Sequence, residues 1–146
     1  MTRIRIFLSF DGEHDEDLRD LLHAQARRAG SSFELSACSH GTDDDDAWEG
    51  SARSRIRAVD EVVVICGEHT DESSRVAAEL RIAREEGKPY LLLWGRRDRM
   101  CTKPAGADRN AAMYRWTRDV LESQMAMTIR NAQPLVVPEN CKRFGS

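Results

Sequence analysis

Short apolar runs alternate with segments of helical spacing along most of this chain. Residues 62–66 are apolar throughout, as expected for a parallel strand that is covered on both faces. Residues 32–36 alternate between polar and apolar side chains, which is typical of a strand with one more exposed face. The pattern predicts strands at residues 4–10, 32–36, 61–66 and 89–94, and an edge strand at 135–137.

Four other segments carry apolar residues at the spacing of an amphipathic helix. In the first, Leu18, Leu21 and Leu22 lie on one face, and Gly30 is the expected end. The apolar positions of the four segments span residues 18–29, 48–59, 76–83 and 113–121.

Alternating strands and helices predict an α/β fold with a parallel sheet and right-handed crossovers. The economical arrangement is flavodoxin-like, with five strands in the order 2-1-3-4-5 and helices on both faces. The chain shows no internal repeat and no linker, so residues 1–146 are expected to form a single domain.

The composition narrows the choice of partners. The formal net charge is −3 and 32% of the residues are charged, so neither a nucleic acid nor a membrane is an expected partner. No apolar run approaches the roughly 20 residues that span a bilayer. A strand that starts at residue 4 leaves no room for a secretory leader. The cysteines are far apart and form no CxxC pair, so we expect reduced thiols in a cytoplasmic protein.

The predicted topology places a crevice at the carboxyl ends of the first and third strands, where open α/β sheets bind their ligands. Ser9, Phe10 and Asp11 leave the first strand at this edge, and residues 67–73 leave the third. Glu79 lies about two turns into the following helix, beside its apolar stripe. Two long segments without predicted regular structure are candidates for covering the crevice: residues 38–47 and 95–108.

The sequence lacks the signatures of several other nucleotide-using or hydrolytic sites. It contains no GxxxxGK[ST] P-loop, no GxGxxG after the first strand and no GxSxG elbow. A phosphorylation receiver shares the topology, but it needs an aspartate where this chain has Cys66-Gly67.

Several short motifs together resemble the TIR domain. They are residues 5–11 (Arg-Ile-Phe-Leu-Ser-Phe-Asp), the apolar third strand, and Ser73 six residues before Glu79. Residues 103–104 (Lys-Pro) and 113–117 (Met-Tyr-Arg-Trp-Thr) are similar to the late segment of a TIR-like subgroup. That subgroup includes the NAD-processing subunit of bacterial Thoeris anti-phage defence systems. One departure is the stretch before Glu79, where TIR helices often carry Trp-Cys and this chain does not.

The resemblance implies a TIR-type fold and an enzyme with NAD as its substrate. The glutamate that matches Glu79 is the catalytic residue of an NAD glycohydrolase or cyclase in the enzymatic members. The implied product is a cyclised ADP-ribose signal, which would activate a separate anti-phage effector. The implied partners are NAD or a related nucleotide, the effector reached through that signal, and further copies of the chain.

The chemistry of such a reaction requires few groups. Breaking the nicotinamide–ribose bond develops positive charge at the anomeric carbon, which a carboxylate stabilises as it does in glycoside hydrolysis. We expect Ser9 and Asp11 to position the substrate from the opposite wall, with Ser73 near them. Phe10 and Trp48 could stack on its rings. No metal is expected.

Each of these residues also has a simpler interpretation. A glutamate beside an apolar stripe, such as Glu79, is typical of a partly solvated surface. Asp11 could cap the first helical region, and Ser73 could be the N-cap of the third helix. Phe10 and Trp48 could belong to the core.

Two charged segments have a similar ambiguity. The acidic residues 43–46 and the Cys38-x-His40 pair could attract a metal, but a solvated loop is the expected state. The basic loop could attract a pyrophosphate or form a solvated or protein-contact surface; its cations are Arg96, Arg97, Arg99, Lys103 and Arg109.

Two other functions stay open at this point. The chain could be a non-enzymatic TIR-type module that works by self-association. It could also be an N-glycosidase that uses Glu79 on another nucleoside-type substrate.

Overall fold

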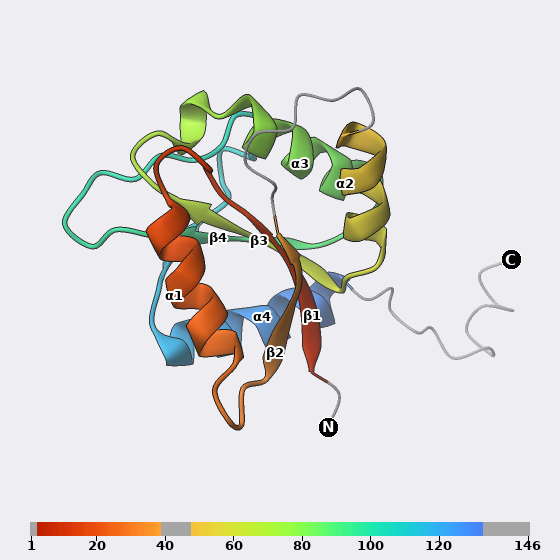
Figure 1. Ribbon diagram of the computed structural model, residues 1–146, viewed down its shortest axis with the longest axis vertical. Helices are drawn as coiled ribbons and strands as arrows, with labels where there is room; N and C mark the ends of the chain where they lie inside the picture. The colour runs from red at the N-terminus through yellow and green to blue at the C-terminus, as the bar shows by residue number, and fades with distance from the viewer. Residues whose placement is uncertain (1–2, 39–47, 133–146) are drawn as a thin grey trace, which may run out of the picture.

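The computed structural model describes residues 3–38 and 48–132 of the chain. Strands and helices alternate from the first strand to the fourth, as the apolar pattern predicts (Figure 1). The strands are β1 (Ile4–Ser9), β2 (Phe33–Cys38), β3 (Glu61–Cys66), β4 (Tyr90–Trp94) and β5 (Met113–Arg115). The helices are α1 (Glu16–Ala26), α2 (Trp48–Arg57), α3 (Ser74–Glu85) and α4 (Arg118–Ala132), with a short 3-10 helix at Thr70–Glu72.

The strands form one parallel sheet in the order β2-β1-β3-β4-β5, which confirms the predicted α/β fold. β3 is the central strand and is buried along its whole length, as its continuous apolar run requires. Ser9 of β1 is in register with Val64 of β3, and Cys66 is in register with Trp94 of β4. The carboxyl ends of these three strands therefore lie along one edge of the sheet.

Helices cover both faces of this sheet. α1 and α4 pack on one face and α2 and α3 on the other (Figure 1). Successive side chains of β3 follow this division, since Val63 and Ile65 pack toward α1 and α4 whereas Val62 and Val64 pack toward α2 and α3. Within the described ranges, no helix is long and apolar enough to cross a bilayer.

The fifth strand is formed by Met113–Arg115, which the sequence pattern assigned to a helix. It pairs in parallel with residues 92–94 of β4. Met113 packs against the cluster under α2 and α3, and Tyr114 packs against the cluster under α1 and α4, which is the alternation of a strand. The helical prediction for this segment is wrong, and the edge strand expected at 135–137 lies outside the described residues.

The error has a simple physical origin. A strand of three residues is too short to show a two-residue period, and Met113, Trp116 and Val120 happen to have helical spacing. The helix itself begins at Arg118, where the Oγ1 of Thr117 accepts a hydrogen bond of 3.2 Å from the backbone N of Val120.

The irregular segment that follows β4 is anchored to the carboxyl edge of the sheet. The backbone N of Gly95 donates to the carbonyl of Cys66 at 2.9 Å, and the backbone N of Thr102 donates to the carbonyl of Gly67 at 2.8 Å. A Cβ at Gly95 would lie 2.8 Å from the Leu18 side chain, so the chain can pass this close only with glycine. This long segment therefore lies against the ends of β3 and β4.

Candidate functional site

A buried pair, Ser9 and Glu79, joins the end of β1 to α3. Ser9 is the last residue of β1 and is fully buried, while Glu79 on α3 is 1% exposed. The Oγ of Ser9 donates a hydrogen bond of 2.7 Å to the Oε1 of Glu79. Burying a carboxylate is costly unless hydrogen bonds compensate for the lost water, so this contact fixes the side chain. The interpretation of Glu79 as a partly solvated surface residue is wrong.

The neighbours of Glu79 on α3 explain its burial. Val76, Leu80 and Ala83 are buried against the sheet, and the position of Glu79 on the helix falls between them. On β1, Ser9 points to the same face as Phe7, because side chains alternate along a strand. The pair consequently lies between β1 and α3, on the face of the sheet that α2 and α3 cover.

The connection from β3 to α3 is held by two local hydrogen bonds. The backbone N of Gly67 donates to the Oγ1 of Thr70 at 2.7 Å, which fixes the turn that follows β3. The backbone N of Val76 donates to the Oγ of Ser73 at 3.2 Å, so the interpretation of Ser73 as the N-cap of α3 is confirmed. Ser73 therefore sets where the helix begins, and with it the position of Glu79.

Asp11 lies beyond Ser9 at the same edge and is engaged by its own loop. Its Oδ1 accepts a hydrogen bond of 3.1 Å from the backbone N of Glu13, and its Oδ2 lies 2.6 Å from the Nδ1 of His14. This hydrogen bond raises the pKa of His14. Asp11 is not the N-cap of α1, because Asp15 occupies that position.

The loops after β1 and β3 meet through two histidines. The rings of His14 and His69 are stacked with their centroids 4.1 Å apart. His69 also has its Nδ1 3.4 Å from the Oε2 of Glu72. The stacked rings join the two loops at the carboxyl edge between β1 and β3, where the topology predicts the crevice.

A second buried carboxylate, Asp15, lies beneath the same loops. The Nη2 of Arg96 contacts the Oδ1 of Asp15 at 3.1 Å and the Oδ1 of Asp17 at 2.9 Å. Burial raises the pKa of Asp15 while Arg96 opposes that shift, and the hydrogen bond from Arg96 lowers the pKa of Asp17. Arg96 thus holds the long segment to α1, and its charge is engaged by these two carboxylates.

Trp48 and Phe10 lie on opposite faces of the sheet. Trp48 begins α2 and packs beside the core under α2 and α3. The guanidinium of Arg75 lies over its ring, 4.2 Å from the centroid, and Arg75 is one turn before Glu79 on α3. Phe10 is 2% exposed in the core under α1 and α4, with Arg19 over its ring. In this arrangement Phe10 is a core residue and its ring has no surface for a substrate.

The structure therefore brings together only part of the predicted site. Ser9 and Glu79 are in contact, and Trp48 is connected to the same helix through Arg75. Residues 39–47 lie outside the described residues, and they include the possible metal ligands at positions 40 and 43–46. In the rest of the chain that the structure describes, no group of three or more histidine, cysteine or acidic side chains is arranged to hold a metal.

Sequence reasoning missed the contacts between loops. Nothing in the sequence indicates that His14 would stack on His69 or that Arg96 would bind Asp15. The position of Arg75 four residues before Glu79 does place both side chains on one side of a helix, and this signal was available.

A comparison with families of known proteins identifies the relatives of this chain. The family described as "Thoeris protein ThsB, TIR-like domain" matches residues 7–99. The chain belongs to this family. The matched residues of the ThsB TIR-like domain run from β1 through β4 and include both Ser9 and Glu79. This membership supports a defence-related, TIR-type function. A comparison with curated proteins finds no match to the chain.

Proposed function

We propose that this ThsB-type TIR-like chain consumes NAD by cleaving the bond between nicotinamide and ribose, with Glu79 as its catalytic carboxylate. The observation that supports this proposal most is the placement of Glu79. It is an acidic side chain that a hydroxyl of β1 holds in the interior, close to the carboxyl edge of the sheet where α/β proteins bind ligands. If this position had only a structural role, an apolar residue would fill it without the cost of burying a carboxylate.

The proposed reaction needs one negative charge beside the nicotinamide ribose. The bond between the anomeric carbon and the nicotinamide nitrogen breaks, and its electron pair leaves with nicotinamide. The ribose ring then carries positive charge that the Glu79 carboxylate stabilises, as in glycoside hydrolysis. No general acid is required, because nicotinamide is cationic in NAD and leaves as a neutral molecule.

The second half of the reaction decides the product. Capture of the cation by water gives ADP-ribose and a proton, whereas capture by a nucleophile of the same molecule gives a cyclised ADP-ribose. The second outcome requires a site that excludes water. The deep burial of Glu79 favours it, and we propose that the cyclised product is the signal that activates a separate anti-phage effector.

The proposal requires the substrate to open the site. Since Glu79 is 1% exposed, the ribose can reach its carboxylate only after neighbouring side chains move. Arg75, one turn before Glu79 on α3, would offer a cation to a nucleotide, and its movement would uncover the ring of Trp48 that it now lies over. Asp11 and Ser9 would contribute polar groups from the other wall.

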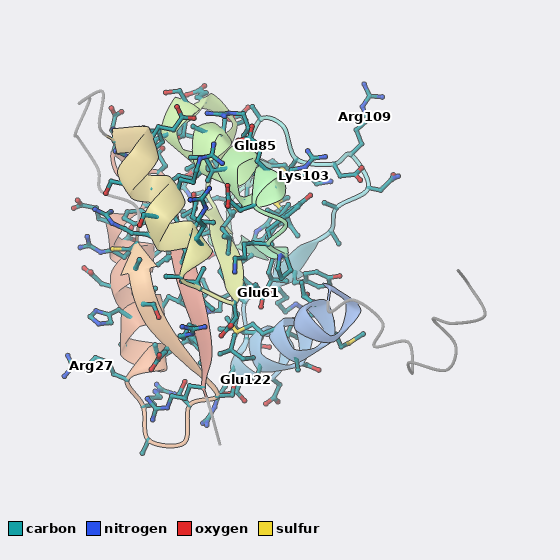
Figure 2. The ribbon with its side chains drawn as sticks, turned by 90° about the vertical axis from the view of Figure 1, so that its right-hand side faces the viewer. Arg27, Glu61, Glu85, Lys103, Arg109 and Glu122 are labelled. Carbon is teal, nitrogen blue, oxygen red and sulfur yellow. The ribbon has the colours of Figure 1, made fainter. Side chains whose placement is uncertain are left out.

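The test is release of nicotinamide from NAD by the purified chain, measured chromatographically. We expect Glu79→Gln to lower the rate by about a hundredfold or more, since it removes the stabilising charge. Glu85→Gln is the matched control, because Glu85 lies on the same helix but is exposed and pairs with Arg53 and Arg81 (Figure 2). Both variants should keep the circular dichroism spectrum of the parent.

The outcome also separates the other two functions. Undiminished nicotinamide release by folded Glu79→Gln would overturn the assignment. Concentration-dependent assembly of the chain without any nicotinamide release would instead support a self-association module. Preferred cleavage of a nucleoside in competition with NAD would support a different N-glycosidase. Nucleotides extracted from infected cells that carry the parent or Glu79→Gln would show whether a cyclised product forms.

A further inference from the structure

A concave site lies at the carboxyl edge of the sheet, away from Ser9 and Glu79. It is a groove of about 210 Å³ between α1 and the carboxyl ends of β4 and β5, near the start of the long segment after β4. We call it the α1–β5 groove. Its lining residues are Leu21, Gln25, Trp94, Gly95, Arg97, Arg115 and Trp116.

The walls of the α1–β5 groove combine apolar and hydrogen-bonding surface. Trp116 packs against the core under α1 and α4, and its Nε1 donates a hydrogen bond of 2.8 Å to the Oε1 of Gln25. This contact fixes both side chains and leaves the amide nitrogen of Gln25 as a donor for a ligand. Leu21 is 57% exposed beside them and provides an apolar surface.

The cations of the groove make no ion pair with the residues that the structure describes. Arg97 and Arg115 are both exposed, and neither has a carboxylate partner within residues 3–38 and 48–132. By contrast Arg96, next to Arg97 in the chain, is held by Asp15 and Asp17. None of the described residues that line the groove is acidic, so their charge is complementary to an anion.

We propose that the α1–β5 groove binds a nucleoside phosphate. The base would lie against Trp116 and Leu21 with the Gln25 amide at its edge, and the phosphate would lie between Arg97 and Arg115. The volume decides the size of the ligand, since clefts for drug-sized ligands measure about 300–1,000 Å³. A groove of about 210 Å³ is smaller than those clefts, so we expect it to enclose one nucleoside unit. This inference does not rest on the proposed NAD cleavage, because it concerns other residues at another part of the sheet edge.

Binding of 5′-AMP to the full chain, followed by isothermal titration calorimetry, tests the proposal. The Glu79→Gln variant should be used as the parent, so that any binding is measured in the absence of the proposed carboxylate. We expect the double variant Arg97→Ala with Arg115→Ala to weaken binding about tenfold or more, because it removes two charge-assisted contacts. Arg3→Ala is the matched control, since this exposed arginine precedes β1 at the amino edge of the sheet, whereas the groove lies at the carboxyl edge.

Two further measurements separate a nucleotide site from a general anion site. Adenosine and inorganic phosphate should each bind at least about tenfold more weakly than 5′-AMP, because each offers half of the contacts. Trp116→Leu and Leu21→Ser each reduce the apolar wall of the groove and should weaken 5′-AMP binding. Because Leu21 is exposed, Leu21→Ser should leave the fold intact, so it tests the apolar wall even if Trp116→Leu does not fold. Equal affinity for phosphate and 5′-AMP, or binding that the double arginine variant leaves unchanged, would overturn the proposal, as would the absence of binding at millimolar 5′-AMP.

Discussion

The hydrogen bond between Ser9 and Glu79 should be measurable as a contribution to stability. Ser9→Ala removes the hydroxyl and leaves a buried carboxylate with one donor fewer. Hydrogen bonds to charged groups contribute about 1.5–3 kcal/mol, so we expect the free energy of unfolding to fall by about that amount. The loss of one oxygen leaves too small a void to add much to this cost. Ser36→Ala, at an exposed position of β2, should change the stability by less than about 0.5 kcal/mol.

A double-mutant cycle isolates the contribution of this pair. Ser9→Ala, Glu79→Ala and the double variant would be unfolded in urea and followed by circular dichroism at neutral pH. Alanine is used at position 79 because the amide oxygen of glutamine could still accept the hydrogen bond from Ser9. Residues in direct contact give coupling energies of about 0.5–3 kcal/mol, and the charge and the 2.7 Å distance place this pair in the upper part of that range. Single effects that add to within about 0.3 kcal/mol would show that the two groups do not interact, and would refute this description of the site.

Three other predictions follow from buried or paired groups. Gly67→Ala should destabilise the fold by about 1–3 kcal/mol in urea unfolding, because its Cβ would lie 2.3 Å from the Oδ2 of Asp15; an unchanged midpoint would contradict that close approach. Burial raises the pKa of Glu61, which lies at the start of β3 (Figure 2), from 4.5 to about 8. The folded state therefore binds this proton more tightly than the unfolded chain, so Tm should fall as the pH rises from 4.5 to about 8, and Glu61→Gln should remove that part of the slope. A slope that persists in the variant would point to other groups. The hydrogen bond to Asp11 raises the pKa of His14 above its usual 6.5, so the stability from this pair is present below pH 6.5 and is lost as the pH rises through the raised value. NMR titration of His14 should show the raised pKa, and Asp11→Asn should bring it back toward 6.5.

The regular part of the fold could be predicted because its periodicity is strong. The sequence pattern predicts β3 with the bounds that the structure shows, residues 61–66. The alternation of strands and helices predicts that the sheet is parallel. β5 could not be predicted in the same way. Three residues at the edge of a sheet gain their conformation from pairing with β4, and that pairing leaves no local pattern.

The candidate site was predictable only where helix geometry determines it. The spacing of Glu79 from Val76, Leu80 and Ala83 placed it beside the buried stripe, and packing against β1 completed its burial. The stacking of His14 on His69 depends on how two loops approach each other in space. Such contacts arise from tertiary structure, so neither propensity nor spacing indicates them.

The most direct measurement of the central claim is a structure of the Glu79→Gln variant with intact NAD bound. The variant should retain the substrate because it lacks the charge that the proposed cleavage requires. The account predicts the nicotinamide ribose between β1 and α3, with a ribose hydroxyl within about 3.5 Å of the residue-79 side chain. NAD bound with its nicotinamide ribose away from this helix, and residue 79 still enclosed against Ser9, would contradict it.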